Sequence, residues 1–325
     1  AALRDQIAAR KSELSEQGLT ASACKRDSVL RELCKRQDKL HANKLSDKIR
    51  AREMERVHIP VLLHEAVDAL MEAGGPDALY FDGTFGRGGH SRWILEKLSA
   101  AGRLKAFDID PMAVVAGRAL QASDDRFEIL HAPFGELAAY AERSGENRLS
   151  GVLLDLGVSS PQLDEAARGF SVKGRKADGP LDLRMNPNQG PSASEWLHSV
   201  SVDELSAVLT QTCHALDQLS INRVAEELVH WQKVHGGPFK SAYQFTRMLK
   251  EGLEAELRVE SPNLKLPSLV KTSLRIHLNE EMPQLRKGLE AAFEALPVGG
   301  RVCVICFNRW EVAAIRDFVR RHEEP

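Results

Sequence analysis

The sequence predicts an α/β protein built on a parallel, doubly wound sheet, and three observations lead to this fold class. Short apolar runs alternate with amphipathic helical patterns, which is the order of parallel strands joined by crossover helices. A glycine-rich turn follows the first run, and aspartates end the second and fourth runs. The runs expected as strands are Leu79–Phe81, Gly102–Asp108, Phe127–His131, Gly151–Asp155 and Gly299–Phe307.

The glycine-rich turn lies within Tyr80–Ser91, and the rest of the chain is organised around it. An amphipathic run, Trp93–Leu98, follows the turn and is expected to be helical. Glycine permits positive φ and lets the backbone approach a ligand closely. A strand, a tight turn and a helix N-terminus together predict a site for a nucleotide-like molecule. The glycines of the turn are Gly83, Gly86, Gly88 and Gly89.

Two aspartates at strand ends indicate what surrounds that molecule. Asp108 lies 19 residues after Gly89, a spacing that suits a carboxylate accepting hydrogen bonds from ribose hydroxyls. Asp155 ends the fourth strand and opens a polar stretch that runs to Gln162. The carboxyl ends of parallel strands share one edge of a sheet, so both aspartates are expected beside the turn. A nicotinamide-dependent dehydrogenase would share the turn but gives no account of the stretch after Asp155.

Helical segments precede the sheet and interrupt it. We expect residues 1–56 to form a basic helical extension, 57–165 and 263–325 a sheet-bearing core, and 166–262 an inserted helical domain for the substrate. Ser192 and Glu195 have the spacing of a capping box. The runs expected as helices from there on are 192–197, 202–209, 221–232, 242–257, 266–282, 283–296 and 311–321.

Charge is distributed unevenly along an otherwise ordinary composition of 43% hydrophobic and 28% charged residues. Residues 1–56 carry fourteen Lys/Arg and nine Asp/Glu, whereas the remainder carries 30 and 37. The extension is therefore either a solvated helix or an arm that docks on RNA or a partner protein. An acidic body does not attract nucleic acid as a whole, so any RNA contact must be local. The loop 168–185, with five basic residues and two acids, is either a solvated loop or a cationic lip beside the site.

The cysteines indicate the cellular compartment, and the apolar runs exclude a membrane-spanning protein. The five cysteines are scattered and odd in number, which argues against a disulfide framework and for a reducing compartment. Cys303 and Cys306 are expected on opposite faces of a strand, so they predict core residues and no metal site. No apolar run approaches the roughly 18–20 residues of a membrane span, and no signal-peptide core is present.

Several motifs together resemble one known family. These are the turn at Asp82–Ser91, the stretch Asp155–Gln162, the run Arg168–Ser171 and the segment Leu181–Met185. In this order they are similar to the bacterial small-subunit rRNA (cytosine-N4)-methyltransferases and their mitochondrial relatives, over residues 58–325. The resemblance implies a class I, Rossmann-like methyltransferase core interrupted by a helical substrate domain. It also implies S-adenosylmethionine (SAM) as cofactor and a cytosine of the ribosomal decoding centre as target.

The resemblance also implies roles for particular residues. Asp155 is the candidate catalytic residue, because a carboxylate accepting the N–H of the cytosine amine would orient its lone pair; the alternative is that Asp155 contacts the cofactor only. Phe134 is expected either to pack on the adenine of SAM or to be a core aromatic residue. Candidate RNA contacts are Arg168, Arg184 and Arg275. The expected SAM contacts are Gly88, Gly89, His90, Asp108, Phe134, Asp155 and Gln162.

Departures from the family pattern leave two functions open. The segments 211–218, 267–276 and 306–312 retain little of the usual motifs, although Arg275 and Ile276 remain. The protein is therefore expected to be either an active rRNA methyltransferase or a weakened relative acting as an RNA-binding assembly factor of the small subunit. Its expected partners are small-subunit rRNA, an assembly intermediate, and other assembly factors through residues 1–56. The charged extension suggests a mitochondrial protein, with the bacterial cytoplasm as the alternative.

Overall fold

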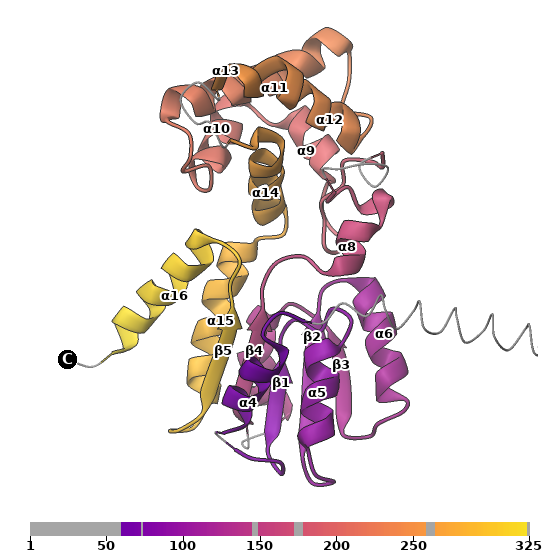
Figure 1. The fold of residues 1–325 in the computed structure, drawn as a ribbon, viewed down its shortest axis with the longest axis vertical. Coiled ribbons are helices and arrows are strands. Elements are labelled where there is room, and N and C mark those ends of the chain that lie inside the picture. The colour runs from indigo at the N-terminus through magenta and orange to yellow at the C-terminus, as the bar shows by residue number, and fades with distance from the viewer. Residues whose placement is uncertain (1–59, 73, 145–148, 172–177, 258–263, 324–325) are drawn as a thin grey trace, which may run out of the picture. The chain divides into compact units, whose positions relative to one another are not determined.

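The computed structural model describes residues 60–72, 74–144, 149–171, 178–257 and 264–323. The helical extension predicted for residues 1–56 lies outside the described residues. Residues 60–325 form one compact unit, and its strands and helices follow the expected alternating order (Figure 1).

The five predicted strands are confirmed, and all of them run parallel in one sheet of order β3-β2-β1-β4-β5. The order changes direction at β1, where neighbouring loops diverge and leave room for a ligand. The central strand β1 is buried along its whole length, which explains its continuous apolar run. The strands are β1 (Leu79–Asp82), β2 (Arg103–Asp108), β3 (Phe127–His131), β4 (Leu149–Asp155) and β5 (Arg301–Ile305).

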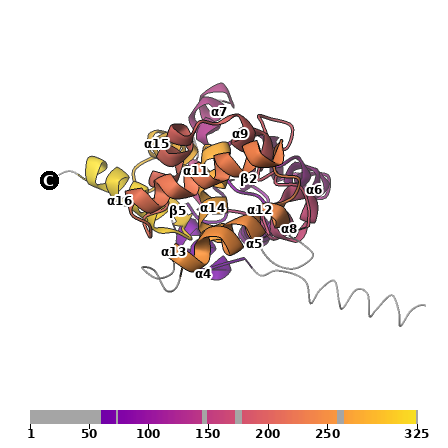
Figure 2. The same cartoon turned by 90° about the horizontal axis from the view of Figure 1, so that it is seen from above.

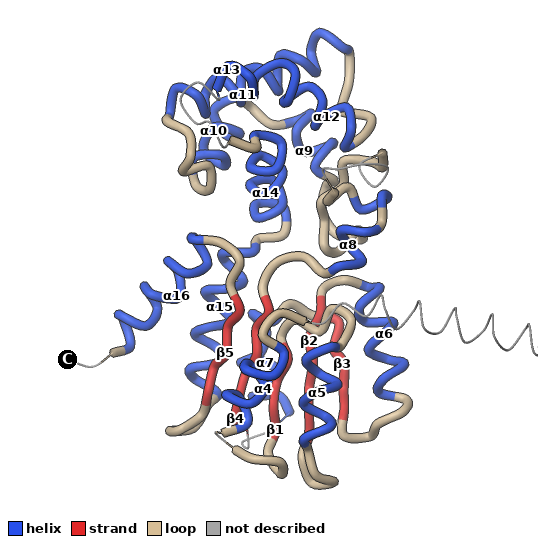
Figure 3. Tube along the Cα trace, viewed as in Figure 1, coloured by secondary structure: helices blue, strands red, loops and turns tan. Residues whose placement is uncertain are grey.

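Helices cover both faces of the sheet (Figure 3). One face packs on α4 (Leu63–Met71), α5 (Gly89–Lys97) and α6 (Pro111–Gln121), and the other on α7 (Leu137–Ser144), α15 (Glu281–Ala295) and α16 (Arg309–His322). Successive strand residues alternate between these two cores, as the pleat requires. Tyr80 and Leu153 lie in the first core, whereas Phe81 and Leu154 lie in the second.

A helical block with its own hydrophobic core lies between β4 and β5 in the chain. Figures 1 and 2 show it over the carboxyl ends of the strands. Its core includes Phe245 and reaches Leu274 near the end of the last helix. The predicted capping box is confirmed, since the Ser192 hydroxyl accepts from the Glu195 amide. The helices are α9 (Ala193–Ser199), α10 (Val202–Thr210), α11 (Gln218–His235), α12 (Ala242–Leu249), α13 (Ala255–Leu257) and α14 (Leu266–Leu278).

Two predicted helices differ from the structure in their details. The run predicted at 242–257 contains a π-helical turn, Lys250–Glu254, between α12 and α13. The helix predicted over 266–282 is wrong at its end, because α14 stops at Leu278 and α15 begins at Glu281. Asn279 lies at this break, and its side chain accepts from the Met185 amide and donates to the Leu183 carbonyl. It thereby ties the junction of α14 and α15 to a distant loop.

Cys303 and Cys306 lie on opposite faces of the sheet, as predicted, although both are half-buried and neither is a core residue. Cys303 packs against the core beneath α4 and α5, and Cys306 against the core beneath α15. Within the described ranges, no group of three or more His, Cys, Asp or Glu side chains is placed to hold a metal ion. None of the described helices combines the length and apolarity that crossing a bilayer requires.

Candidate cofactor and acceptor site

The glycine turn joins β1 to α5 at the carboxyl edge of the sheet. Gly86 and Gly88 have φ of 55° and 75°, and Gly88 is the N-cap of α5. A Cβ at Gly88 would lie 2.7 Å from the ring of Phe85, and one at Gly89 would lie 2.2 Å from Pro60. At Gly86, by contrast, no atom comes within 3.8 Å of a Cβ position. The backbone therefore forms a cradle with open space at Gly86, bounded behind by tight packing.

Asp82 fixes the start of the turn. Its carboxylate is buried and accepts hydrogen bonds from the Ser91 hydroxyl at 2.6 Å and the Thr84 amide at 3.1 Å. Burial raises the pKa of Asp82, and the bond from Ser91 opposes that rise. Asp82 is a site residue that was not predicted from the sequence, although its place just before the glycines was a usable signal. The Thr84 hydroxyl in turn accepts from the Asp155 amide at 2.7 Å, which joins the turn to β4.

Asp108 lies where a ribose-binding carboxylate is expected, at the end of β2. One of its oxygens accepts from the Gly86 amide at 2.7 Å and the other from the Asp110 amide at 2.8 Å. Each carboxylate oxygen offers two lone pairs, so both retain capacity for ribose hydroxyls. Burial raises the pKa of Asp108 to about 6.

Because Asp108 is the predicted ribose contact, its raised pKa predicts that affinity for the expected cofactor, SAM, depends on pH. The ionised carboxylate is the better acceptor for ribose hydroxyls, so protonation below pH about 6 opposes binding. We expect the Kd for SAM to be constant above pH about 7 and to rise as the pH falls through 6, by up to about tenfold per pH unit. Calorimetry from pH 5 to 8 measures this. Asp108→Asn should bind more weakly at pH 8 and show a flat profile; an unchanged profile in that variant would assign the titration to another group.

His90 and Asp155 face each other across the edge of the sheet. The His90 side chain is buried, and its Nε2 lies 3.2 Å from the Val61 carbonyl. A carbonyl only accepts, so Nε2 carries a proton, and the other ring nitrogen, Nδ1, faces Asp155 Oδ2 at 3.7 Å. The Asp155 side chain is 25% exposed, and its Oδ1 atom is buried.

Gln162 belongs to a buried cluster around Asp110. Its Nε2 donates to Asp110 Oδ2 at 2.9 Å, and its Oε1 accepts from the Ser159 amide at 2.9 Å in a capping box. Arg168 donates to the same Asp110 oxygen at 2.8 Å and also to the carbonyls of Arg184 and Met185. The cluster joins the loop after β2 to α8 (Ser160–Asp164) and to the loop that carries Arg184 and Met185. Its geometry gives Gln162 a positioning role, and a direct contact with SAM stays a prediction.

Phe134 begins the short 3-10 turn Phe134–Glu136 and packs with the core on the α15 side of the sheet. A Cβ at Gly288 of α15 would lie only 2.5 Å from its ring. A Cβ at Gly83 would lie 2.8 Å from Phe134 Cβ, so Phe134 packs directly against the glycine turn. Phe134 is only partly buried, so stacking on adenine and a role as a core aromatic both stay predictions.

The candidate RNA arginines already have acidic partners. Arg184 pairs with Asp182 at 2.7 Å, and Arg275 pairs with Glu281 at 2.7 Å. The Arg168 side chain is 9% exposed and pairs with Asp110. Contact with RNA stays a prediction for all three, whereas the structure shows them tying loops and helices together. The other basic residues of the predicted lip, Lys173, Arg175 and Lys176, lie outside the described residues.

The site fits a nucleoside with an amino-acid tail. The turn leaves open space at Gly86, Asp108 offers acceptors for a ribose, and Asp155 lies across the same edge. Together with the parallel sheet and its helices, this site defines a class I SAM-dependent methyltransferase.

The chain belongs to the MraW methylase family, whose sequence profile matches residues 55–325. Membership of a methylase family with this fold identifies the cofactor as SAM. The family match spans both the sheet and the helical block, so the block is part of the family pattern.

Comparison with solved structures gives remote likenesses. An rRNA methylase from Streptococcus thermophilus shares 20% identity over 31% of this chain and 58% of its own, with a TM-score of 0.25. A methyltransferase from Geobacter sulfurreducens shares 17% over 34% and 57%, with a TM-score of 0.26. A 1,6-didemethyltoxoflavin-N1-methyltransferase from Burkholderia thailandensis shares 23% over 45% and 60%, with a TM-score of 0.23. Each match covers less than two thirds of the other chain.

Proposed function

We propose that this protein methylates the N4 amine of a cytosine in small-subunit ribosomal RNA during maturation of that subunit. The observation that carries the proposal is the place of Asp155, whose backbone is bonded to Thr84 of the glycine turn and whose carboxylate faces the same edge. A methyl donor and an acceptor amine bound at this edge would meet beside that carboxylate. Membership of the MraW methylase family supports RNA as the acceptor.

Asp155 supplies what a weak nucleophile needs. The cytosine amine is unreactive because its lone pair is delocalised into the ring. A carboxylate that accepts one N–H directs the lone pair away from the ring and stabilises the positive charge that develops on nitrogen. Bound SAM supplies the electrophilic methyl group. Asp155 thus orients the amine and receives an acidic proton after the new N–C bond forms, so no strong base is required.

The surroundings of Asp155 support this role. Thr84 holds its backbone at 2.7 Å, and His90, fixed by the Val61 carbonyl, lies 3.7 Å from its carboxylate. The first contact fixes the backbone of Asp155, and the second places a polar side chain beside its carboxylate. Both support the positioning that transfer to a weak nucleophile requires. The same proposal includes pre-ribosomal particles as partners and residues 1–56 as an additional contact with them. It also includes a mitochondrial location.

Transfer in vitro tests the proposal. The purified chain is incubated with methyl-labelled SAM and either free small-subunit rRNA or small subunits, and the RNA is digested to nucleosides for mass spectrometry. We expect the label in N4-methylcytidine. Asp125→Asn, an exposed position between α6 and β3, serves as the matched control. Label in another nucleoside would refute the N4 assignment, and SAM binding without any transfer would favour the assembly-factor function instead.

A further inference from the structure

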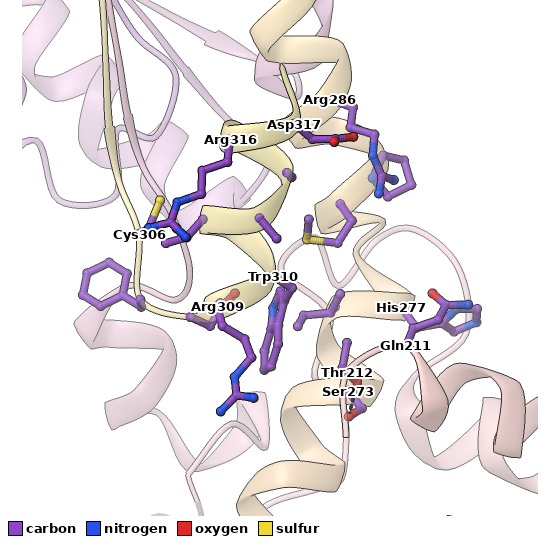
Figure 4. A pocket seen from close by; sticks show the side chains of 18 of the residues that line it. Gln211, Thr212, Ser273, His277, Arg286, Cys306, Arg309, Trp310, Arg316 and Asp317 are labelled. Atoms are coloured by element: carbon purple, nitrogen blue, oxygen red, sulfur yellow. Dashed lines mark hydrogen bonds between the residues drawn. The ribbon is translucent and has the colours of Figure 1, made fainter. Parts of the chain in front are cut away.

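A wide groove lies between the helical block and α16, beside the site already described. It encloses about 1340 Å³, more than the roughly 300–1,000 Å³ of a small-molecule pocket. One wall is α16, the second is the start of α15, and the third is formed by the ends of α10 and α14 (Figure 4). The dimensions suit an extended, chain-like ligand better than a metabolite.

Four arginines line this groove, and they differ from the arginines of the site in having no carboxylate partner among the described side chains. Arg286 lies on α15, and Arg309, Arg316 and Arg320 lie on α16. All four are exposed, and none of their guanidinium groups has a hydrogen-bond or ion-pair partner among the residues that the structure describes. Arg168, Arg184 and Arg275, by contrast, are each paired with a carboxylate. The groove thus concentrates unpaired positive charge in an otherwise acidic body.

Carboxylates do not cancel this charge. The lining contains two, Glu280 and Asp317, against four guanidinium groups. The three arginines of α16 recur at intervals of seven and four residues, so they form one row along the helix. A row of unpaired guanidinium groups is a match for the regularly spaced phosphates of a nucleic acid.

Trp310 adds an aromatic surface to the same groove. Its indole lies between the start of α16 and the part of α14 that carries Ser273 (Figure 4). The indole N–H is shielded from solvent and has no acceptor within the described part of the chain. A half-exposed aromatic ring among arginines is the combination with which proteins bind single-stranded nucleic acid, because every base has a face that can stack.

The groove is continuous with the edge that carries Asp155. β5 pairs with β4 so that Ile305 lies opposite Asp155, and the Leu156 amide donates to the Ile305 carbonyl at 3.1 Å. The next residues, Cys306 and Phe307, line the groove. A strand whose target base reaches Asp155 can therefore continue directly into it.

We infer that this groove binds the single-stranded RNA flanking the methylated base, with the arginines of α16 on its phosphates and Trp310 against a base. The inference rests on the proposed function and extends it to a surface. An acidic protein segment is the competing occupant, and it differs in offering no bases to Trp310.

The test measures RNA affinity of the full chain by fluorescence anisotropy, with a labelled single-stranded RNA of about 20 nucleotides as probe. In Arg316→Gln/Arg320→Gln we expect weaker binding and a salt slope smaller by about 1.4, since each phosphate contact on a single strand contributes about 0.7. The matched control is Arg118→Gln/Arg143→Gln, two exposed arginines on α6 and α7, which should bind as the unaltered chain does.

Trp310 provides an independent arm. Trp310→Ala should weaken RNA binding about fivefold or more, as expected for loss of one stacked base, and Trp310→Phe should restore most of it. SAM affinity should be unchanged in all groove variants, which shows that they are folded. RNA affinity and salt slope equal to the control would overturn the inference, as would a poly-glutamate peptide that binds in an arginine-dependent manner while RNA does not. If the unaltered chain transferred no methyl group to RNA, that result would instead refute the proposed function.

Discussion

Asp155→Asn is expected to lower the rate of methyl transfer by about 10²–10³-fold, the range for removing one group that stabilises transition-state charge. The change keeps the size of the side chain and replaces one acceptor oxygen by an amide, which cannot stabilise positive charge on the cytosine amine. Single-turnover transfer from labelled SAM measures the rate. Because the backbone bond from Asp155 to Thr84 is unaffected, SAM affinity should stay within a few-fold.

The two measurements together separate the roles open to Asp155. If the transfer rate falls while SAM affinity is retained, Asp155 acts on the acceptor cytosine. A loss of SAM affinity that accounts for the whole effect would make Asp155 a cofactor contact only. Transfer at the rate of the Asp125→Asn control would remove Asp155 from the chemistry altogether.

Arg168→Gln is expected to lower the free energy of unfolding by about 3–5 kcal/mol, because it leaves the Asp110 carboxylate in a buried site without its cation. The side chains of the pair are 9% and 6% exposed. Arg168 also donates to the carbonyls of Arg184 and Met185 at 3.1 and 2.8 Å, and these would lose their donor. Denaturant unfolding measures the change.

A double-mutant cycle with Asp110→Asn isolates the interaction. Removing both charges avoids the unpaired carboxylate, so the double variant should be more stable than the sum of the single effects predicts. Arg247→Gln is the matched control, because Arg247 and Glu251 form an exposed pair one helical turn apart worth about 0.3–0.5 kcal/mol. A coupling no larger than that of the exposed pair would show that the buried cluster does not hold the loops together.

Much of the fold followed from local patterns in the sequence. Each strand is a short apolar run bounded by polar or glycine residues, and the alternation with helices fixed the parallel sheet. The turn was predictable because positions such as Gly88 require positive φ. Asp108 and Asp155 were predictable because they end strands, and strand ends in a parallel sheet meet at one edge.

The contacts that shape the site were not predictable in this way. Arg168 and Asp110 are 58 residues apart in the chain, and a basic residue in a polar loop looks the same whether it faces solvent or a buried carboxylate. Asn279 likewise gave no local sign that it would hold Met185, 94 residues away. The groove is formed by α15, α16 and the ends of α10 and α14, and α10 lies far from the other three in sequence. Its row of arginines therefore acquires meaning only in the fold.

The most direct test of the central claim is to map N4-methylcytosine in small-subunit rRNA from cells that carry the gene, lack it, or carry only Asp155→Asn. The proposed function predicts that one such mark disappears on deletion, returns with the unaltered gene and does not return with the variant. A mark that persists after deletion, together with stalled assembly of the small subunit, would contradict methyl transfer by this protein.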